Sequence, residues 1–391
     1  MKRVRPILIL AGAVWMLLSG CQAGRSREAS PAQRIENINR EHVRIFGDFH
    51  LPRTIGAVPN TGLQLPTVSP DGEWLLHLRS DGGDLDPRTL LGDPNATPAE
   101  GTLTVMLRPT AGGEPGRPIS KGYRWAHSPV WSPTGRSMAF VANEPPGSSI
   151  IHLDLATGRQ TVLGVPHALN CLPRFAASDD QIVYCSAVDF DHPFRIYRQR
   201  IEGEPQPMAP KGDELLLPVS VNANEAVVCA RNAADSLEWV LARPSGLTLL
   251  AGDCGLGNRA AALQTLAGVA DPISPNGDRL LFYDTRQNRI CLLDLRDNRL
   301  QRHRQGAIAA CWLTDDVFAL ATSDYLFSAN VETGLSPQIL DGPWIPLRYV
   351  PARRTLLILG PQGPNRFAIV EVRFVERNAN TDRPNTEPAP R

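Results

Sequence analysis

The feature that most constrains the fold is a four-residue turn, Ser-Pro-x-Gly, that recurs directly ahead of short apolar segments. It occurs at residues 69–72, 132–135 and 274–277, and each copy precedes a run such as WLLHL or SMAFVA. Proline at the second position presets φ, and glycine at the fourth position tolerates the exit geometry, so the turn is specified chemically. The recurrence predicts a repeat protein built from antiparallel β-strands.

One complete repeat can be followed from residue 125 to residue 164. An inner strand at 128–132 leads through the Ser-Pro-Thr-Gly turn into a second strand at 136–142. A third strand at 149–155 passes through the Thr157-Gly158 hairpin into a fourth at 160–163. Four short antiparallel strands that recur along a chain are typical of the blade of a β-propeller.

Two sets of turns count the blades independently. Weaker versions of the first turn precede apolar strands at residues 177–180, 222–225, 314–316 and 351–354, which brings that set to seven. Turns between third and fourth strands contain Gly or Asn, which supply positive φ in short hairpins. There are six of these, at residues 111–113, 157–158, 202–203, 245–246, 297–298 and 333–334.

The missing fourth strand of the last repeat has a donor near the N-terminus. Residues 43–49 (VRIFGDF) alternate apolar positions and precede the first inner strand. We predict that they pair with residues 367–375, which would close the ring and remove two open sheet edges. The predicted fold is therefore all-β: a single β-propeller of seven four-stranded blades closed by an N-terminal strand. Six blades are the alternative, because the fourth and seventh turns are the weakest.

The Ser-Pro-x-Gly turns, followed by hairpins such as Leu153-Asp154-Leu155-Ala156-Thr157-Gly158, resemble the repeats of TolB-type propellers, which also occur in prolyl oligopeptidases. The resemblance implies the propeller fold. It covers nearly the whole predicted domain but concerns the repeat only, because the chain has no room for the separate α/β domain of TolB. The Gly-x-Ser-x-Gly motif of a serine hydrolase is absent from the sequence.

The N-terminal segment predicts a bacterial lipoprotein. Lys2, Arg3 and Arg5 precede an apolar stretch at residues 7–18, which is too short to span a bilayer but suits a signal peptide. The segment ends Leu-Ser-Gly-Cys, which resembles a lipobox with Cys21 as the acylated N-terminus. Acyl chains on Cys21 would anchor the chain to a membrane. Gln22 in the next position favours the periplasmic side of the outer membrane over the inner membrane.

These features divide the chain into four segments. We predict a signal peptide at residues 1–20, the lipidated cysteine and a flexible tether at 21–41, the propeller at 42–375 and a disordered polar tail at 376–391. Without the three basic residues of the signal peptide, the chain carries about three more acidic than basic residues, and no basic stripe suggests nucleic acid. The six other cysteines lie mostly in apolar runs and suit buried positions. One plausible disulfide pair is Cys171 with Cys185, on adjacent strands of the same unit.

Binding is expected on the propeller face that carries the long connections. Insertions at residues 80–102, 187–195 and 252–268 all fall on this face, and long loops on a rigid scaffold commonly carry function. The opposite face has only tight turns. By position and chemistry the candidates for a binding face are Arg124, Trp125, Asp189, His192 and Trp344.

Two classes of function compete. His127, His167 and His192 lie near the same face and are weak candidates for a metal site, which some TolB-like propeller lyases use on pectin fragments. No H-x-H or H-x-x-x-H spacing links them. We therefore expect no cofactor, no catalytic residues, and a non-catalytic binding or scaffold module for a protein, peptide or cell-wall polymer in the envelope. The alternative is a carbohydrate lyase with a histidine-held metal.

Overall fold

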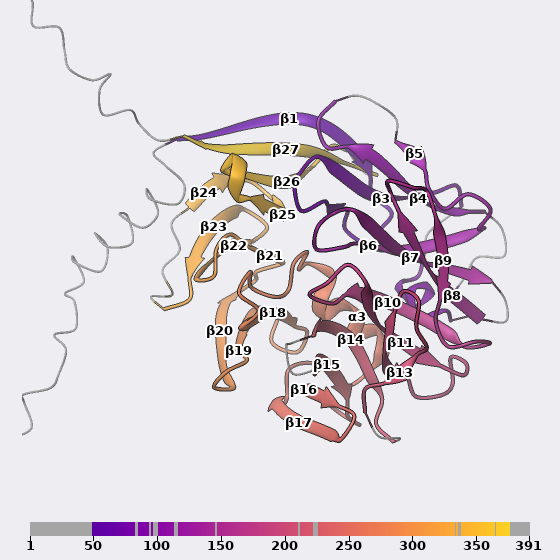
Figure 1. The fold of residues 1–391 in the computed structure, drawn as a ribbon. Coiled ribbons are helices and arrows are strands. Elements are labelled where there is room, and N and C mark those ends of the chain that lie inside the picture. The colour runs from indigo at the N-terminus through magenta and orange to yellow at the C-terminus, as the bar shows by residue number, and fades with distance from the viewer. Residues whose placement is uncertain are drawn as a thin grey trace, which may run out of the picture.

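The computed structural model describes residues 49–82, 85–93, 95–96, 101–112, 116–144, 147–209, 212–221, 226–332, 334, 338–363 and 365–375. Almost every regular element in these ranges is a β-strand, with one α-helix, α3 (Arg259–Ala267), and two short 3₁₀ helices, η1 (Pro87–Leu91) and η2 (Pro351–Arg353). Figure 1 shows the strands arranged in blades around a centre, with the colour progressing once around the ring.

The first four blades follow one another along the chain. Blade 1 contains β2 (Thr67–Val68), β3 (Trp74–Ser80), β4 (Leu103–Pro109) and β5 (Arg117–Pro118). Blade 2 contains β6 (Trp125–Trp131), β7 (Ser137–Glu144), β8 (Gly147–Asp154) and β9 (Gln160–Leu163). Blade 3 contains β10 (Leu169–Phe175), β11 (Gln181–Ala187), β12 (Arg195–Arg200) and β13 (Gln206–Pro207). Blade 4 contains β14 (Leu215–Val221), β15 (Val227–Asn232), β16 (Leu237–Arg243) and β17 (Gly246–Ala251).

The remaining three blades complete the ring. Blade 5 contains β18 (Arg279–Asp284), β19 (Arg289–Asp294) and β20 (Arg299–Gln305), and its inner position is reduced to one bridge between Ile273 and Leu280. Blade 6 contains β21 (Ala309–Trp312), β22 (Val317–Ala321), β23 (Tyr325–Asn330) and β24 (Gln338–Asp341). Blade 7 contains β25 (Ile345–Val350), β26 (Thr355–Pro361), β27 (Arg366–Val375) and β1 (Phe49–Pro59). The predicted all-β propeller is confirmed, and the described strands are consistent with seven blades. A single parallel pairing of Leu103 with Trp125 joins blades 1 and 2 into one eight-stranded sheet.

The Ser-Pro-x-Gly turns share one set of hydrogen bonds. In the second copy, Gly135 N donates to Ser132 O at 2.9 Å, and Ser137 N donates to Ser132 Oγ at 3.1 Å. The other two copies repeat both bonds, and the three glycines have φ of 73 to 81°. The serine therefore closes the turn through its carbonyl and side chain together, which explains why this residue recurs.

The ring is closed by an N-terminal strand, but not by the one expected. β1 pairs antiparallel with β27, from Phe49 opposite Val375 to Pro59 opposite Arg366. The predicted partner is correct, whereas the donor lies later than residues 43–49, most of which are outside the described residues. A register shift between Thr54 and Gly56 interrupts the pairing. Pro52, Pro59 and this irregularity are tolerated because β1 is an outer strand with one unpaired edge. Figure 1 shows β1 beside β27.

Apolar clusters fill the seams between neighbouring blades. The seam between blades 7 and 1 contains Val58, Val68 and Leu75 packed against Leu347 and Ile369, among others. Corresponding clusters occupy the other seams. The closure of the ring is thus stabilised in two ways. β1 pairs with β27, and the apolar side chains of blades 7 and 1 are removed from water at the seam between them.

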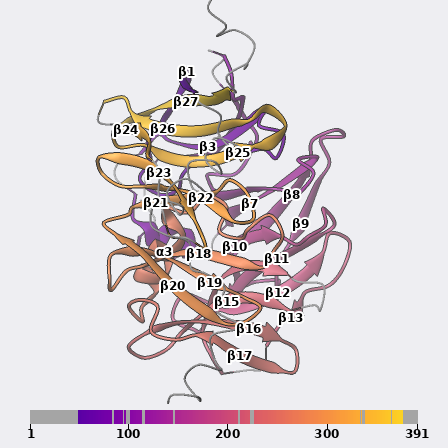
Figure 2. The ribbon, with the colours of Figure 1, turned by 90° about the vertical axis from the view of Figure 1, so that its left-hand side faces the viewer.

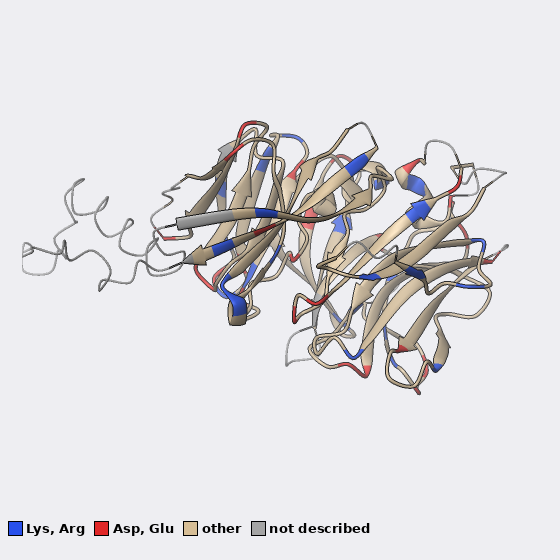
Figure 3. Cartoon of the chain, turned by 90° about the horizontal axis from the view of Figure 1, so that it is seen from above, with Lys and Arg blue, Asp and Glu red and all other residues tan. Residues whose placement is uncertain are grey.

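The predictions for both chain ends lie outside the described residues: the signal peptide, Cys21, the tether and the tail. Within the described part, no helix is long and apolar enough to cross a membrane. All six cysteines there are buried free thiols, and Cys171 lies directly opposite Cys185 in the pairing of β10 with β11. Figure 3 shows acidic and basic residues interspersed over the blades.

Candidate functional site: the central channel

The inner strands line a central channel and carry an unusual backbone feature. Ser128, Leu172 and Leu217 each precede a proline and have φ of 51 to 52°, a region that such residues rarely adopt. The register shifts at the same three points, so each inner strand bulges there. Such strain costs roughly 1–3 kcal/mol per residue and is commonly found at functional sites. The residue after each proline, which is Val130, Arg174 or Val219, lines the channel.

Insertions cover the channel on one face, which we call the loop-rich face. η1 comes from the insertion at residues 80–102, and α3 comes from the one at 252–268. α3 begins where the Asn258 side chain accepts a hydrogen bond from Ala261 N at 2.8 Å, a typical N-cap. Beneath these two helices lies a cavity of about 260 Å³ with mainly apolar walls, including Leu90, Leu172, Leu217 and Leu263. Figure 2 shows the ring edge-on, with α3 toward one side.

Arg259 ties the third insertion to this cover. Its Nε donates to Glu214 Oε1 at 2.7 Å, and its terminal nitrogens donate to the carbonyl oxygens of Phe190 and His192. The guanidinium carbon also lies 4.8 Å and 5.1 Å from the ring centroids of Phe190 and Phe194. Residues 187–195 and α3 therefore share one face, as the loop lengths predict.

The wider opening lies on the other face, which we call the turn face because it carries the Ser-Pro-x-Gly turns. A cavity of about 410 Å³ there is lined by the prolines of all three such turns, by Pro351 of the weaker turn at residues 351–354 and by residues of the inner strands. Trp131, Phe175, Trp312 and Tyr349 form an aromatic collar around it. The two indole N–H groups donate to Thr67 O at 3.1 Å and Pro272 O at 3.2 Å, which fixes both rings. Aromatic rings held this way offer apolar contact area at low entropic cost.

Three charged side chains line the two cavities among the described residues: Arg174, Asp271 and Arg348. Arg348 lies 3.4 Å from the Asp271 carboxylate and donates to Val68 O at 3.2 Å. Arg174 lines both cavities and has no hydrogen bond or ion pair within the part of the chain that the structure describes. Burial lowers the pKa of Arg174, and the nearby Asp271 carboxylate opposes that shift. The channel therefore carries an excess positive charge.

The residues predicted for the binding face are dispersed. Trp125 is buried in the core between blades 1 and 2, while Arg124 is exposed with its Nε on Gly101 O at 3.1 Å. Trp344 lies half-buried against Gly360 and donates to Asp341 O.

Asp189 and His192 form an exposed pair 2.6 Å apart, and this hydrogen bond lowers the pKa of Asp189. This pair is separate from Trp125, which lies in the core between blades 1 and 2, and from Trp344, which lies against Gly360 of blade 7.

The three histidines also stand apart. His127 is fully buried between Ser128 Oγ at 3.0 Å and Asn143 Oδ1 at 3.2 Å, and burial lowers its pKa to about 4. His167 and His192 are exposed. Across the described ranges, no group of three or more His, Cys, Asp or Glu side chains is placed to hold a metal ion.

The channel residues were missed from the sequence, although a signal existed. Trp131, Phe175 and Trp312 are each the last residue of an inner strand, just ahead of the turn. Arg174 lies one position earlier in the same strand as Phe175. Reading the position before each turn as the channel mouth would have found the collar.

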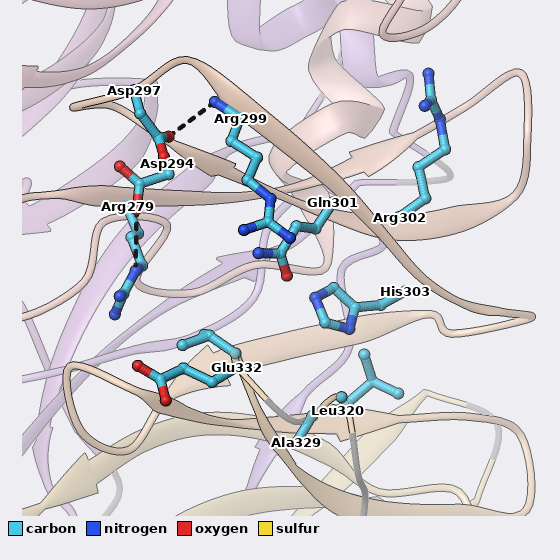
Figure 4. Close-up of a pocket in the computed structure, with 12 residues that line it drawn as sticks. Arg279, Asp294, Asp297, Arg299, Gln301, Arg302, His303, Leu320, Ala329 and Glu332 are labelled. Atoms are coloured by element: carbon cyan, nitrogen blue, oxygen red, sulfur yellow. Dashed lines mark hydrogen bonds and ion pairs between the residues drawn. The ribbon is translucent and has the colours of Figure 1, made fainter. Parts of the chain in front are cut away.

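A third cavity, of about 870 Å³, opens between blades 5 and 6. Figure 4 shows Arg299, Gln301 and His303 projecting from β20 into it, with Glu332 opposite. Its basic and acidic side chains balance, and Arg279 on its wall is already paired with Asp294 and Asp316. The channel, with its unbalanced charge, is the stronger candidate for a binding site.

No protein-family profile matches the sequence, and no curated protein sequence matches it. Solved structures do share its fold. An oligogalacturonate lyase in complex with manganese gives a TM-score of 0.51 at 11% identity, covering 84% of this chain and 91% of that one. An acylaminoacyl peptidase from Pyrococcus horikoshii gives 0.50 at 12% identity, covering 80% of this chain and 51% of that one. TolB from Acinetobacter baumannii gives 0.41 at 14% identity, covering 62% of this chain and 61% of the TolB chain.

The likeness to the lyase and the peptidase confirms the β-propeller fold. At these identities the shared fold does not define a function, which depends on the side chains of the site.

Proposed function

We propose that the protein is a lipid-anchored lipoprotein of the bacterial envelope whose propeller binds a partner without catalysing a reaction. The partner is a protein, peptide or cell-wall polymer that enters the channel from the turn face. The observation that carries this proposal is the cavity of about 410 Å³ with its aromatic collar, which is the kind of concave and mainly apolar surface that binds ligands.

The anchor part of the proposal rests on the sequence. The basic start, the apolar segment and the Leu-Ser-Gly-Cys ending support acylation of Cys21, and Gln22 supports the periplasmic side of the outer membrane. Replacing Cys21 by Ser should release the protein from the membrane fraction. A Cys21→Ser variant that stays membrane-bound after a high-salt wash would refute the lipid anchor.

The binding part can be tested by photo-crosslinking in intact cells. A crosslinker at Pro133 or Pro351, both exposed beside the channel mouth, should capture a partner. Matched sites at Arg124 and His192 report on the loop-rich face, where the sequence places the binding surface. Capture mainly from Arg124 and His192 would overturn the channel proposal and favour the loop-rich face.

A carbohydrate lyase is the second candidate, because the oligogalacturonate lyase spans most of this chain with a similar fold. In this chain His127 is already bonded to Ser128 and Asn143 and lies away from solvent, which does not favour a ligand role. Incubation with oligogalacturonate and added Mn²⁺ distinguishes the two. Formation of unsaturated products would establish the enzyme.

A further inference from the structure

We propose that the channel binds the carboxylate of a peptide on Arg174. This inference rests on the proposed function and names the chemistry of the partner. Arg174 lies on β10 where the two cavities meet, so its guanidinium can be reached from the turn face and from beneath α3. A guanidinium has five N–H donors in a planar fork that matches a carboxylate.

Within the described ranges, the guanidinium of Arg174 has no hydrogen-bond or ion-pair partner. A half-buried guanidinium without hydrogen bonds is costly, and the nearby Asp271 carboxylate offsets its desolvation only in part. The only carboxylate among the described channel residues is that of Asp271, which lies within 3.4 Å of Arg348. Asp271 therefore neutralises one of two arginines. A ligand with one carboxylate would balance the other.

The walls of the channel decide in favour of a peptide over an acidic sugar. The cavity beneath α3 is lined largely by Leu, Val, Ala and Pro side chains. Sugar hydroxyls buried there would lose their hydrogen bonds to water with few replacements, which disfavours their binding. Apolar side chains of a peptide would be favoured in the same space.

The aromatic collar would contact the bound peptide where it leaves the channel. A peptide carboxylate flanked by apolar residues, either at a C-terminus or on an Asp or Glu side chain, therefore fits Arg174, the apolar cavity beneath α3 and the collar.

The test uses purified full-length chain in detergent micelles and three small probes. The first is N-acetyl-leucyl-leucine with a free carboxylate, the second is its C-terminal amide, and the third is N-acetyl-leucyl-aspartyl-leucine amide. Binding is measured by ligand-observed NMR titration. Arg174→Gln is compared with Arg366→Gln, a matched change at an exposed arginine at the start of β27.

We expect one or both acidic probes to bind saturably, and the amide of the first probe to bind at least tenfold more weakly. Arg174→Gln should weaken acid binding at least tenfold, because charge-assisted hydrogen bonds are lost, while Arg366→Gln should leave it unchanged. The two acidic probes separate a C-terminal carboxylate from a side-chain one. Because Arg174→Gln removes a charge that Asp271 compensates only in part, the thermal midpoint of the variant should not fall, and an unchanged midpoint excludes misfolding as the cause.

Equal binding of acid and amide, or unchanged binding in Arg174→Gln, would overturn the inference. So would saturable binding of a galacturonate oligomer with no binding of either acidic peptide. Crosslinking tests the proposed function separately. If capture at Pro133 or Pro351 persisted in Arg174→Gln, the channel would remain the binding site, and only the inference that Arg174 binds a carboxylate would be refuted.

Discussion

Closure of the ring can be tested at one side chain of β1. Val58 is fully buried in the seam between blades 7 and 1, against apolar residues of both blades. Val58→Ala removes two methyl groups. Their transfer to water costs about 1.5 kcal/mol at about 0.8 kcal/mol per group, and the cavity left behind adds about 1 kcal/mol. We therefore expect the free energy of unfolding to fall by about 2–3 kcal/mol.

The measurement is urea unfolding at 25 °C, followed by circular dichroism on the chain without residues 1–21. Thr54→Ala is the matched control, because Thr54 lies on the same strand with an exposed side chain. It should change stability by no more than about 0.5 kcal/mol. If Val58→Ala proved as stable as Thr54→Ala, β1 would not be part of the folded core and the closure would be refuted.

Three further predictions concern the interior and the cover of the channel. Burial raises the pKa of the Cys185, Cys229 and Cys311 thiols, and it raises the pKa of the Cys254 and Cys291 thiols to about 12, so the native protein should not react with a maleimide at pH 8. Unfolding should expose six reactive thiols at positions other than Cys21. A count of four reactive thiols would show that Cys171 and Cys185 are joined in a disulfide. Arg259→Ala leaves Glu214 without its charged partner, while the hydrogen bond from Asn232 remains, so it should cost about 2 kcal/mol. It should also speed hydrogen exchange in residues 187–195, and unchanged exchange would refute the contact between this loop and α3. Burial lowers the pKa of His127 from 6.5 to about 4, so between these pH values the unfolded chain binds a proton that the folded chain does not. The free energy of unfolding should therefore fall by about 3 kcal/mol as the pH drops from 6.5 to 4. Urea midpoints measured across that range should change less with pH in His127→Gln.

The turns made the repeat predictable from the sequence, whereas the closing strand was harder to locate. Ser132, Pro133 and Gly135 specify local geometry whatever surrounds them, so the blades could be counted. β1 contains Pro52, Gly56 and Pro59, which usually argue against a strand. Tertiary context permits them at a ring's outer edge, and no local pattern conveys that context.

The candidate site was harder to predict, because it is assembled across the ring. Arg174, Asp271 and Arg348 come from blades 3, 5 and 7, and only the closed ring brings their side chains to one channel. The lengths of the insertions correctly indicated that they share a face. They did not indicate that α3 and η1 would cover the channel there and leave the turn face open.

The pairing of Phe49 with Val375 has a topological consequence. The two ends of the folded domain meet in one rung of a sheet, so the backbone is almost a closed loop. A short linker between these ends would suit circular permutation, with a new start cut at an exposed hairpin such as Thr157-Gly158. Such a permutant would retain all seven blades while moving the predicted tether to another blade. The orientation of the ring relative to the proposed membrane anchor could therefore be engineered independently of the fold.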